Sequence, residues 1–196
     1  MRNHFVSLFP SHAERGPSPS RRRVVFLTVL LLLAGLCSLG VIRVVHADSL
    51  PQVHLNADSI GPRPIEELTG HNVTRDYANA WRDLAQALEK DQPDLLNAYF
   101  TGFAKDALLK KISEQKKTGV HTRYVDHGHQ LKAFFYAPDG GEMQLLDKAQ
   151  MEEQILDGDK VIHRENSTQQ YLVLMTPGAD RWFVRSLEPV PDSFGQ

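Results

Sequence analysis

The stretch VTRDYANAWRDLAQAL, residues 73 to 88, decides the fold, because its apolar residues recur at spacings of three and four. The recurring positions are Val73, Tyr77, Trp81, Leu84, Ala85 and Leu88. This period places the apolar side chains along one face of an α-helix. We therefore predict a long amphipathic first helix, whose apolar face needs a partner surface.

Two further helices are predicted directly after this stretch. Pro93 is acceptable in a first helical turn, and the second apolar face consists of Leu95, Leu96, Tyr99, Phe100 and Phe103. A third helix begins at Ala104 and ends at Gly119, a natural C-terminal stop. The chain therefore has three helices in succession.

From residue 120 the pattern changes to β-prone segments separated by turn residues. The predicted strands are Val120 to Val125, Leu131 to Ala137, Met143 to Leu156, Gln170 to Met175 and Trp182 to Leu187. Gly-rich and Asp-rich turns separate several of them, so neighbours should pair as antiparallel hairpins. Helices followed by a strand meander predict the α+β class.

Upstream of the first helix the sequence predicts a membrane anchor. Residues 24 to 42 carry no formal charge, and nineteen helical residues span about 28 Å, close to the roughly 30 Å of a bilayer core. Five arginines and one glutamate precede this run, so the N-terminus should stay in the cytoplasm. We expect a disordered cytoplasmic tail (1–20), a transmembrane helix or signal anchor (21–46), an extended linker (47–71) and a domain outside the membrane, periplasmic or extracellular.

A cleaved signal peptide is the alternative to a retained anchor. Val45 and Ala47 are small or aliphatic residues at the positions that a signal peptidase inspects, so cleavage after Ala47 would give a secreted protein. The apolar run exceeds a usual signal sequence, which favours retention. Cys37 is the only cysteine, so the domain has no disulfides.

Composition and motifs exclude several classes of function. Lys and Arg number 22 against 24 Asp and Glu, and no basic stripe is present, so nucleic acid is not an expected partner. The sequence has no nucleophile elbow, Gly-rich phosphate loop, zinc-protease helix or paired-cysteine motif. We therefore predict no cofactor and assign no catalytic residue.

The order of elements resembles that of the NTF2-like superfamily. The resemblance covers residues 72 to 190 and rests on the long first helix with a central Trp81, two shorter helices and a meander ending in DRWFVRSL, residues 180 to 187. The segments AQMEEQI (149–155) and QYLVL (170–174) are similar to Tim44-like and ARC-type intermembrane-space domains. The resemblance implies a cone: three N-terminal helices packed on a curved antiparallel sheet, with residues 191–196 as a tail.

The resemblance also implies a cavity at the wide end of the cone. Isomerases and dehydratases of this type need a carboxylate base and a tyrosine or second acid facing that cavity. Asp126, Asp147 or Glu153 on the strands supply candidate acids. The candidate ligand-pocket residues are Tyr77, Trp81, Tyr99 and Glu153. Tyrosines at helical spacing are more often core residues, however, and strand acids are more often solvated.

His127 and His129 are the candidates for a metal site. The two residues are two apart and would point to one face of an extended strand. They flank Gly128, where a hairpin is expected to turn, and no third ligand stands at a diagnostic spacing. An exposed polar turn is therefore the preferred interpretation, and we predict no metal.

These observations favour binding over catalysis. We predict a membrane-tethered NTF2-like domain outside the cytoplasm that acts as a non-catalytic interaction or assembly module. The expected partners are the lipid bilayer through residues 24–42, a membrane or envelope protein, and a second copy of the chain in a homodimer. The alternative is a small-molecule-binding or ketosteroid-isomerase-like protein that uses the cone cavity.

Overall fold

The computed structural model describes residues 50–58 and 60–193, which belong to one compact unit, Ser49–Gln196. Apart from two short strands that come first, its helices precede a strand meander, in agreement with the predicted α+β class. The elements are β1 (Val53–Asn56), β2 (Gly61–Pro62), α2 (Glu67–Glu89), the 3-10 helix η1 (Pro93–Ala98), α3 (Gly102–Thr118), β3 (Val120–Tyr136), β4 (Met143–Asp157), β5 (Lys160–Pro177) and β6 (Trp182–Val190).

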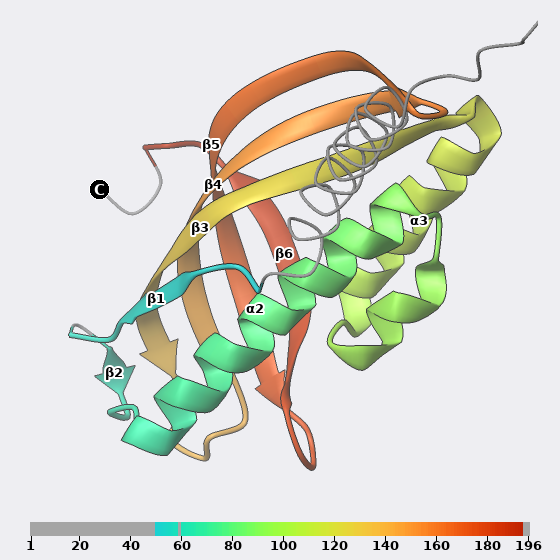
Figure 1. The fold of residues 1–196 in the computed structure, drawn as a ribbon. Coiled ribbons are helices and arrows are strands. Elements are labelled where there is room, and N and C mark those ends of the chain that lie inside the picture. Colours follow the sequence, from blue (N-terminus) through green and yellow to red (C-terminus); the bar gives the residue numbers. More distant parts are fainter. Residues whose placement is uncertain (1–49, 59, 194–196) are drawn as a thin grey trace, which may run out of the picture. The chain divides into compact units, whose positions relative to one another are not determined.

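A single curved sheet forms the body of the domain (Figure 1). Its strand order is β1-β3-β4-β5-β6, with β3 to β6 antiparallel and with β1 and β2 parallel to β3. Register shifts interrupt β3 between Asp126 and Gly128 and again between Ala133 and Phe135. Such bulges bend long strands and increase their twist, which explains how strands of 15 to 18 residues curve around the helices.

Helix α2 lies across the concave face of this sheet (Figure 1). Its inward residues are those that the 3.6-residue period selects, and Val73, Tyr77, Trp81 and Leu84 are at most 4% exposed. They meet the inward residues of the strands, among them Leu145 and Val173. Helices α2 and α3 lie on one face of the sheet, and among residues 50–58 and 60–193 no helix covers the opposite face of β3, β4 and β5.

The predicted extended linker, residues 47–71, is wrong from Val53 onward. Val53–Asn56 pairs with His129–Lys132, and α2 begins at Glu67 rather than near Val73. Val53 and Leu55 pack against the core, and the N–H of His129 donates to the Gln52 carbonyl at 2.8 Å. A short strand without long apolar periodicity can join an edge because its backbone, more than its side chains, makes the contact.

Two further element predictions need correction. The second predicted helix is a short 3-10 helix, η1, whose Leu96 is the only residue of its six that is buried. Gly128 does not mark a hairpin: β3 runs through it as one strand, with a bulge there. Glycine is common both at β-bulges and at turns, so the position of Gly128 in the sequence could not distinguish a bulge from a hairpin turn.

The predicted single-pass membrane placement is also corrected. Across residues 50–58 and 60–193, no helix combines the length and the apolar character that crossing a bilayer requires. Helix α2 is the longest described helix, and its polar face carries Arg75, Arg82 and Gln86. The proposed span at residues 24–42, the tail at residues 1–20 and the alternative cleavage after Ala47 fall outside the described residues.

Candidate functional site

A chain of four hydrogen-bonded polar side chains runs through the interior of the cone. The Tyr77 hydroxyl donates to Asp147 Oδ2 at 2.8 Å, and the same oxygen lies 2.7 Å from His129 Nδ1. On the other side of the imidazole ring, Nε2 lies 2.8 Å from Asp126 Oδ2. We call Tyr77, Asp147, His129 and Asp126 the buried polar chain.

The bulge in β3 builds this arrangement. In a regular strand Asp126 and His129 would point to opposite faces, because they are three residues apart. The extra residue at the bulge, His127, restores both side chains to the inner face. Gly128 makes this possible with a φ of 129°, and its N–H donates to Asp126 Oδ1 at 2.8 Å, which fixes the carboxylate.

The geometry and the electrostatics together favour a protonated His129, an imidazolium. Each ring nitrogen faces a carboxylate oxygen, and only the protonated ring can donate from both nitrogens at once. Burial lowers the pKa of His129, but the hydrogen bonds to Asp126 and Asp147 outweigh it and raise that pKa to about 9. The ring is therefore charged at neutral pH, and neither nitrogen is free to act as a base.

Tyr77 and Asp147 close the inner end of the chain. Burial and the Asp147 carboxylate raise the pKa of Tyr77 well above its ordinary range, so the hydroxyl stays a donor. Asp147 is completely buried, and its Oδ1 makes no hydrogen bond within the described residues. A buried acceptor without a partner is uncommon and marks a place where a water or a ligand oxygen or nitrogen would be stabilised.

Aromatic rings enclose His129. The Trp81 ring lies against the imidazole, with centroids 4.6 Å apart and planes at 39°, and Tyr77 meets it edge-on at 5.6 Å. Tyr124 and Tyr171 pack in turn against Trp81 at 6.3 and 5.5 Å. A cation against an indole face is favourable, more so when both are removed from water. The rings therefore stabilise the charge and also fill the interior.

At the outer end of these rings the site reaches solvent. Lys111 Nζ on α3 donates to the Tyr124 hydroxyl at 2.7 Å and lies 3.9 Å from Glu153 Oε1. Burial lowers the pKa of Lys111 and raises the pKa of Tyr124, although the Lys111 and Glu153 side chains are still about two-fifths exposed, at 39% and 38%. This end combines an ammonium, a phenol and a carboxylate.

The structure separates the four predicted ligand-pocket residues. Tyr77 and Trp81 are neighbours in the core, and Glu153 stands at the outer end beside Lys111. Tyr99 is engaged elsewhere: its ring lies 5.4 Å from the Arg181 guanidinium, and its carbonyl accepts from the Val184 N–H. No common pocket therefore emerges from these four positions.

The two histidines considered for metal binding do not share a face. His129 is completely buried, whereas His127 occupies the bulge and is exposed. The bulge is the physical reason, since it breaks the two-residue alternation on which the prediction rested. Among residues 50–58 and 60–193, no three His, Cys, Asp or Glu side chains are arranged to hold a metal.

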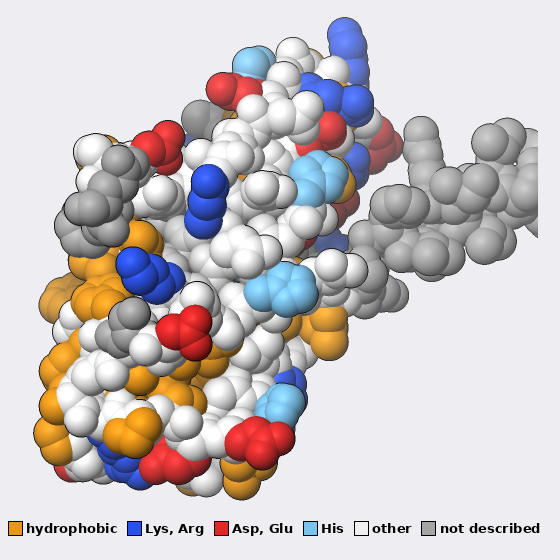
Figure 2. Space-filling view, turned by 90° about the vertical axis from the view of Figure 1, so that its left-hand side faces the viewer, with side chains coloured by type: hydrophobic (Ala, Val, Ile, Leu, Met, Phe, Trp, Pro, Cys, Tyr) orange, Lys and Arg blue, Asp and Glu red, His pale blue; other side chains and the backbone are white. Residues whose placement is uncertain are grey.

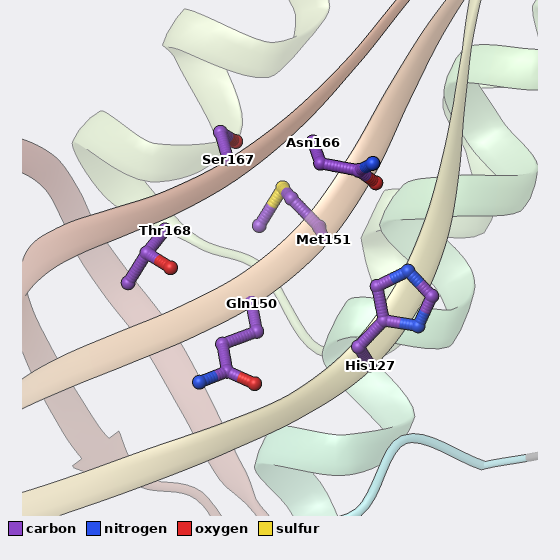
Figure 3. Close-up of a pocket in the computed structure, with 6 residues that line it drawn as sticks. All are labelled: His127, Gln150, Met151, Asn166, Ser167 and Thr168. Atoms are coloured by element: carbon purple, nitrogen blue, oxygen red, sulfur yellow. The ribbon is translucent and has the colours of Figure 1, made fainter.

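An open hollow of about 280 Å³ lies beside the bulge. Figure 3 shows its side chains on three neighbouring strands, β3, β4 and β5. They are His127, Gln150, Met151, Asn166, Ser167 and Thr168. The lining is mostly polar and neutral, and it includes no member of the buried polar chain.

Farther along the same strands, the outer face of the sheet is apolar. Phe134 is 38% exposed, and Leu146, Leu172 and Leu174 are half-buried on the face away from the helices. The register places Leu146 directly beside Leu172, so these side chains adjoin. Figure 2, which looks at the side that is on the left in Figure 1, shows apolar side chains gathered toward one end, with backbone and other side chains over most of the remaining described surface. We call Phe134, Leu146, Leu172 and Leu174 the outer apolar patch.

Sequence reasoning found parts of the interior site. Asp126, Asp147 and Tyr77 were considered as converging groups, and His129 as a metal ligand. Tyr124 was missed. Tyr124 is two residues before Asp126, so the alternation of side chains along a strand places both on the same face. That alternation was the sequence signal that could have identified Tyr124. That His129 links the two carboxylates depends on the bulge, for which Gly128 was only an ambiguous indication.

Comparison with known proteins identifies the fold. No family model and no curated protein sequence matches the chain. Among solved structures, the chain is similar to the intermembrane space region of the chloroplast protein ARC6, with a TM-score of 0.55, 11% identity, and coverage of 67% of this chain and 100% of that one. The similarity to ActVI-ORFA from Streptomyces coelicolor has a TM-score of 0.43 at 13% sequence identity, and it covers 61% of this chain and 94% of that one.

A putative scytalone dehydratase from Novosphingobium aromaticivorans gives a TM-score of 0.42 at 15% identity, covering 59% and 80% of the two chains. At these identities the likeness to the ARC6 region shows the fold alone. The mixed α+β architecture, with few helices on a curved sheet, fits the NTF2-like fold that the sequence analysis predicted.

Proposed function

We propose that this domain is a non-catalytic protein-interaction module that works through the outer face of its sheet. The observation that carries the proposal is the contrast between the two faces. The inner face is filled by packed side chains, whereas the outer face presents the outer apolar patch, over which no helix of the described residues lies. Contiguous exposed apolar surface on a folded domain is typical of a binding surface.

The filled interior argues against catalysis there. Tyr77, His129 and Asp147 are completely buried, and Trp81 is 4% exposed. Both imidazole nitrogens already face carboxylates, so the ring has no lone pair to offer a substrate. The buried polar chain is thus better suited to fixing α2 onto β3 and β4 than to proton transfer with a bound molecule.

A photocrosslinking experiment tests the outer face. A photoreactive phenylalanine analogue is placed at Leu172 in the full-length chain, and a matched variant carries it at Lys110, an exposed residue of α3. In cells that produce the chain, we expect a discrete crosslinked species from position 172 and none from position 110. Adding Leu174→Asp should abolish that species, because a carboxylate in the outer apolar patch would have to lose its hydration on docking.

The proposal fails if position 172 gives no discrete species, or if positions 172 and 110 give the same ones. It also fails if Leu174→Asp leaves the crosslink unchanged while circular dichroism shows the variant to be folded. Identification of the crosslinked chain by mass spectrometry gives the partner's identity independently of these outcomes.

Small-molecule binding in the cone is the second candidate, and the unpartnered Asp147 Oδ1 is the observation that favours it. A ligand would enter beside Lys111, Tyr124 and Glu153, where charged groups remain partly exposed. Thermal-shift screening with small hydroxy-aromatic ketones tests this candidate. A stabilising compound whose effect disappears in Tyr124→Phe, but persists in Tyr99→Phe, would support it; no stabilising compound would count against it.

A further inference from the structure

The sheet has an open edge along the first half of β5. Strand β6 pairs only with residues 170–177 of β5, and among the described residues no other strand lies on that side of β5. Strand β6 ends at Val190, and Pro191 has no N–H with which to continue the ladder. We call residues 163–169, between the register shift near the β4–β5 hairpin and the start of pairing with β6, the open edge.

Pro189 indicates which backbone groups face the open edge. It is paired with Tyr171, and because proline has no N–H it fits a position whose backbone groups face away from β5. In an antiparallel sheet this orientation alternates from residue to residue, so the backbone of Tyr171 faces β4 and that of Gln170 faces β6. The same alternation turns the even-numbered residues of the open edge outward. These residues are Arg164, Asn166 and Thr168, and all three are exposed.

The hollow on β3, β4 and β5 adjoins this edge (Figure 3). Asn166 and Thr168 contribute to its lining, with Gln150 on the neighbouring strand. A strand added beside β5 would lie about 4.8 Å away, so a long side chain on its outer face would reach over Thr168 into the hollow. The amides and hydroxyls there suit a neutral, hydrogen-bonding side chain such as glutamine or asparagine.

We propose that the open edge and the hollow together bind an extended peptide segment of another protein, which pairs with β5 as an added strand in line with β6. Hydrogen bonds between the two backbones supply the affinity, and the hollow selects one side chain of the peptide. The outer apolar patch takes no part in these contacts. The inference therefore goes beyond the proposed function and does not depend on it.

The shape of the edge favours a peptide over a second copy of the chain. The β4–β5 hairpin limits the open edge at one end, and β6 limits it at the other. If two copies paired antiparallel along this edge, the β6 of each copy would lie in the path of the other copy's hairpin tip, residues 157–160. A peptide segment brings no second strand, so it fits between the two limits.

Peptide selection followed by backbone substitution tests the proposal. Random dodecapeptides displayed on phage are selected against the immobilised full-length chain, and the enriched peptide is synthesised. Thr168→Pro removes an N–H that faces the open edge, so it should weaken binding of this peptide about tenfold or more in isothermal titration calorimetry. Proline is tolerated at edge positions whose N–H faces solvent, so the variant should fold. Thr168→Val keeps the N–H and should change the dissociation constant less than about threefold.

Hydrogen exchange separates strand addition from binding through side chains alone. In the free chain, the amides of Asn166 and Thr168 should exchange faster than that of Ser167, which faces β4. The peptide should slow the exchange of Asn166 and Thr168 and leave that of Ser167 nearly unchanged. N-methylation along the peptide backbone should abolish binding at every second position and be tolerated between them, because only alternate amides of a strand face its neighbour.

The inference is overturned if no peptide is enriched, or if the enriched peptide binds Thr168→Pro as tightly as the wild type. Protection of the Asn166 and Thr168 amides in the free chain would also contradict it. Asn166→Pro is a second variant of the same design, for use if circular dichroism shows Thr168→Pro to be unfolded. If sedimentation velocity shows a dimer of the free chain that these substitutions dissociate, a second copy occupies the edge and the peptide is ruled out.

Discussion

At the scale of single residues, His129 is the centre of the domain's interior. It carries a positive charge between two carboxylates, and it is completely buried beneath Trp81. Removing one partner of a buried ion pair is strongly destabilising because the other charge remains without water. The buried polar chain therefore ties together α2, β3 and β4 in one arrangement, and we interpret it as a device of structural specificity.

The hydroxyl of Tyr77 contributes measurably to stability. Tyr77→Phe removes a hydrogen bond to a buried carboxylate and should lower the free energy of unfolding by about 1.5–3 kcal/mol, measured by urea denaturation. Tyr99→Phe is the matched control, since it keeps the ring that Arg181 contacts, and it should change stability by less than about 0.5 kcal/mol. Equal effects of the two substitutions would contradict this account.

The charge of His129 should appear in the pH dependence of stability. Its pKa is raised from 6.5 to about 9 in the folded protein, so the stabilisation is complete below about pH 6.5 and is lost as the pH rises to 9. The free energy of unfolding should fall by an amount on the order of 3 kcal/mol between these pH values. Urea denaturation at pH 6 and at pH 9.5 measures this difference.

Nitrogen NMR of the imidazole rings provides the control. His129 should remain doubly protonated at pH 7.5, and Asp126→Asn should lower its pKa because one carboxylate partner is lost. A neutral His129 at pH 7.5 in the wild-type chain would show that a carboxyl group holds the proton instead.

At the scale of elements, the bulge in β3 matters most. Gly128 has a φ of 129°, which side-chain-bearing residues rarely adopt, and an added Cβ would lie 3.4 Å from the Gln52 carbonyl oxygen. Gly128→Ala should therefore destabilise the domain by about 1–3 kcal/mol. Gly70→Ala, within α2 and with ordinary contacts of 3.5 Å or more, should be neutral or slightly stabilising in the same thermal unfolding assay.

The elements also show what the sequence made predictable. The periodicity of Val73, Tyr77 and Trp81 identified α2 and its buried face, because burial along a long helix depends on a local repeat. The edge strand β1 and the bulge at His127 escaped prediction because both depend on backbone pairing between distant segments. The buried polar chain was not predicted for the same reason. The contacts among Asp126, His129 and Asp147 depend on the bulge and on the β3–β4 register, which the sequence does not reveal.

At the scale of the whole domain, the N-terminal edge belongs to the fold. A chain that begins at Ser49 should unfold at the temperature of the full-length chain, since the compact unit starts there. A chain that begins at residue 72, the boundary predicted from sequence, lacks β1, β2 and the first turn of α2. It should be less stable by about 3 kcal/mol or more, because Val53 and Leu55 no longer cover the core. Equal unfolding temperatures would place β1 outside the cooperative unit.

The two faces of the sheet have different roles in the domain. The inner face contains the buried polar chain, whereas the outer face carries the outer apolar patch, whose Phe134 is 38% exposed. Substitutions in the outer apolar patch should therefore alter association before they alter folding. The crosslinking experiment at Leu172 can therefore report on association while the domain stays folded.

The contact between Trp81 and His129 has an optical consequence. A protonated imidazole accepts electrons from an excited indole, so a charged His129 with its ring centroid 4.6 Å from that of Trp81 should keep the tryptophan's emission dim. Loss of the proton, or separation of α2 from β3, would release the quenching and brighten the protein. The domain thus contains its own fluorescent reporter, with no dye attached, for the ionisation state of its interior.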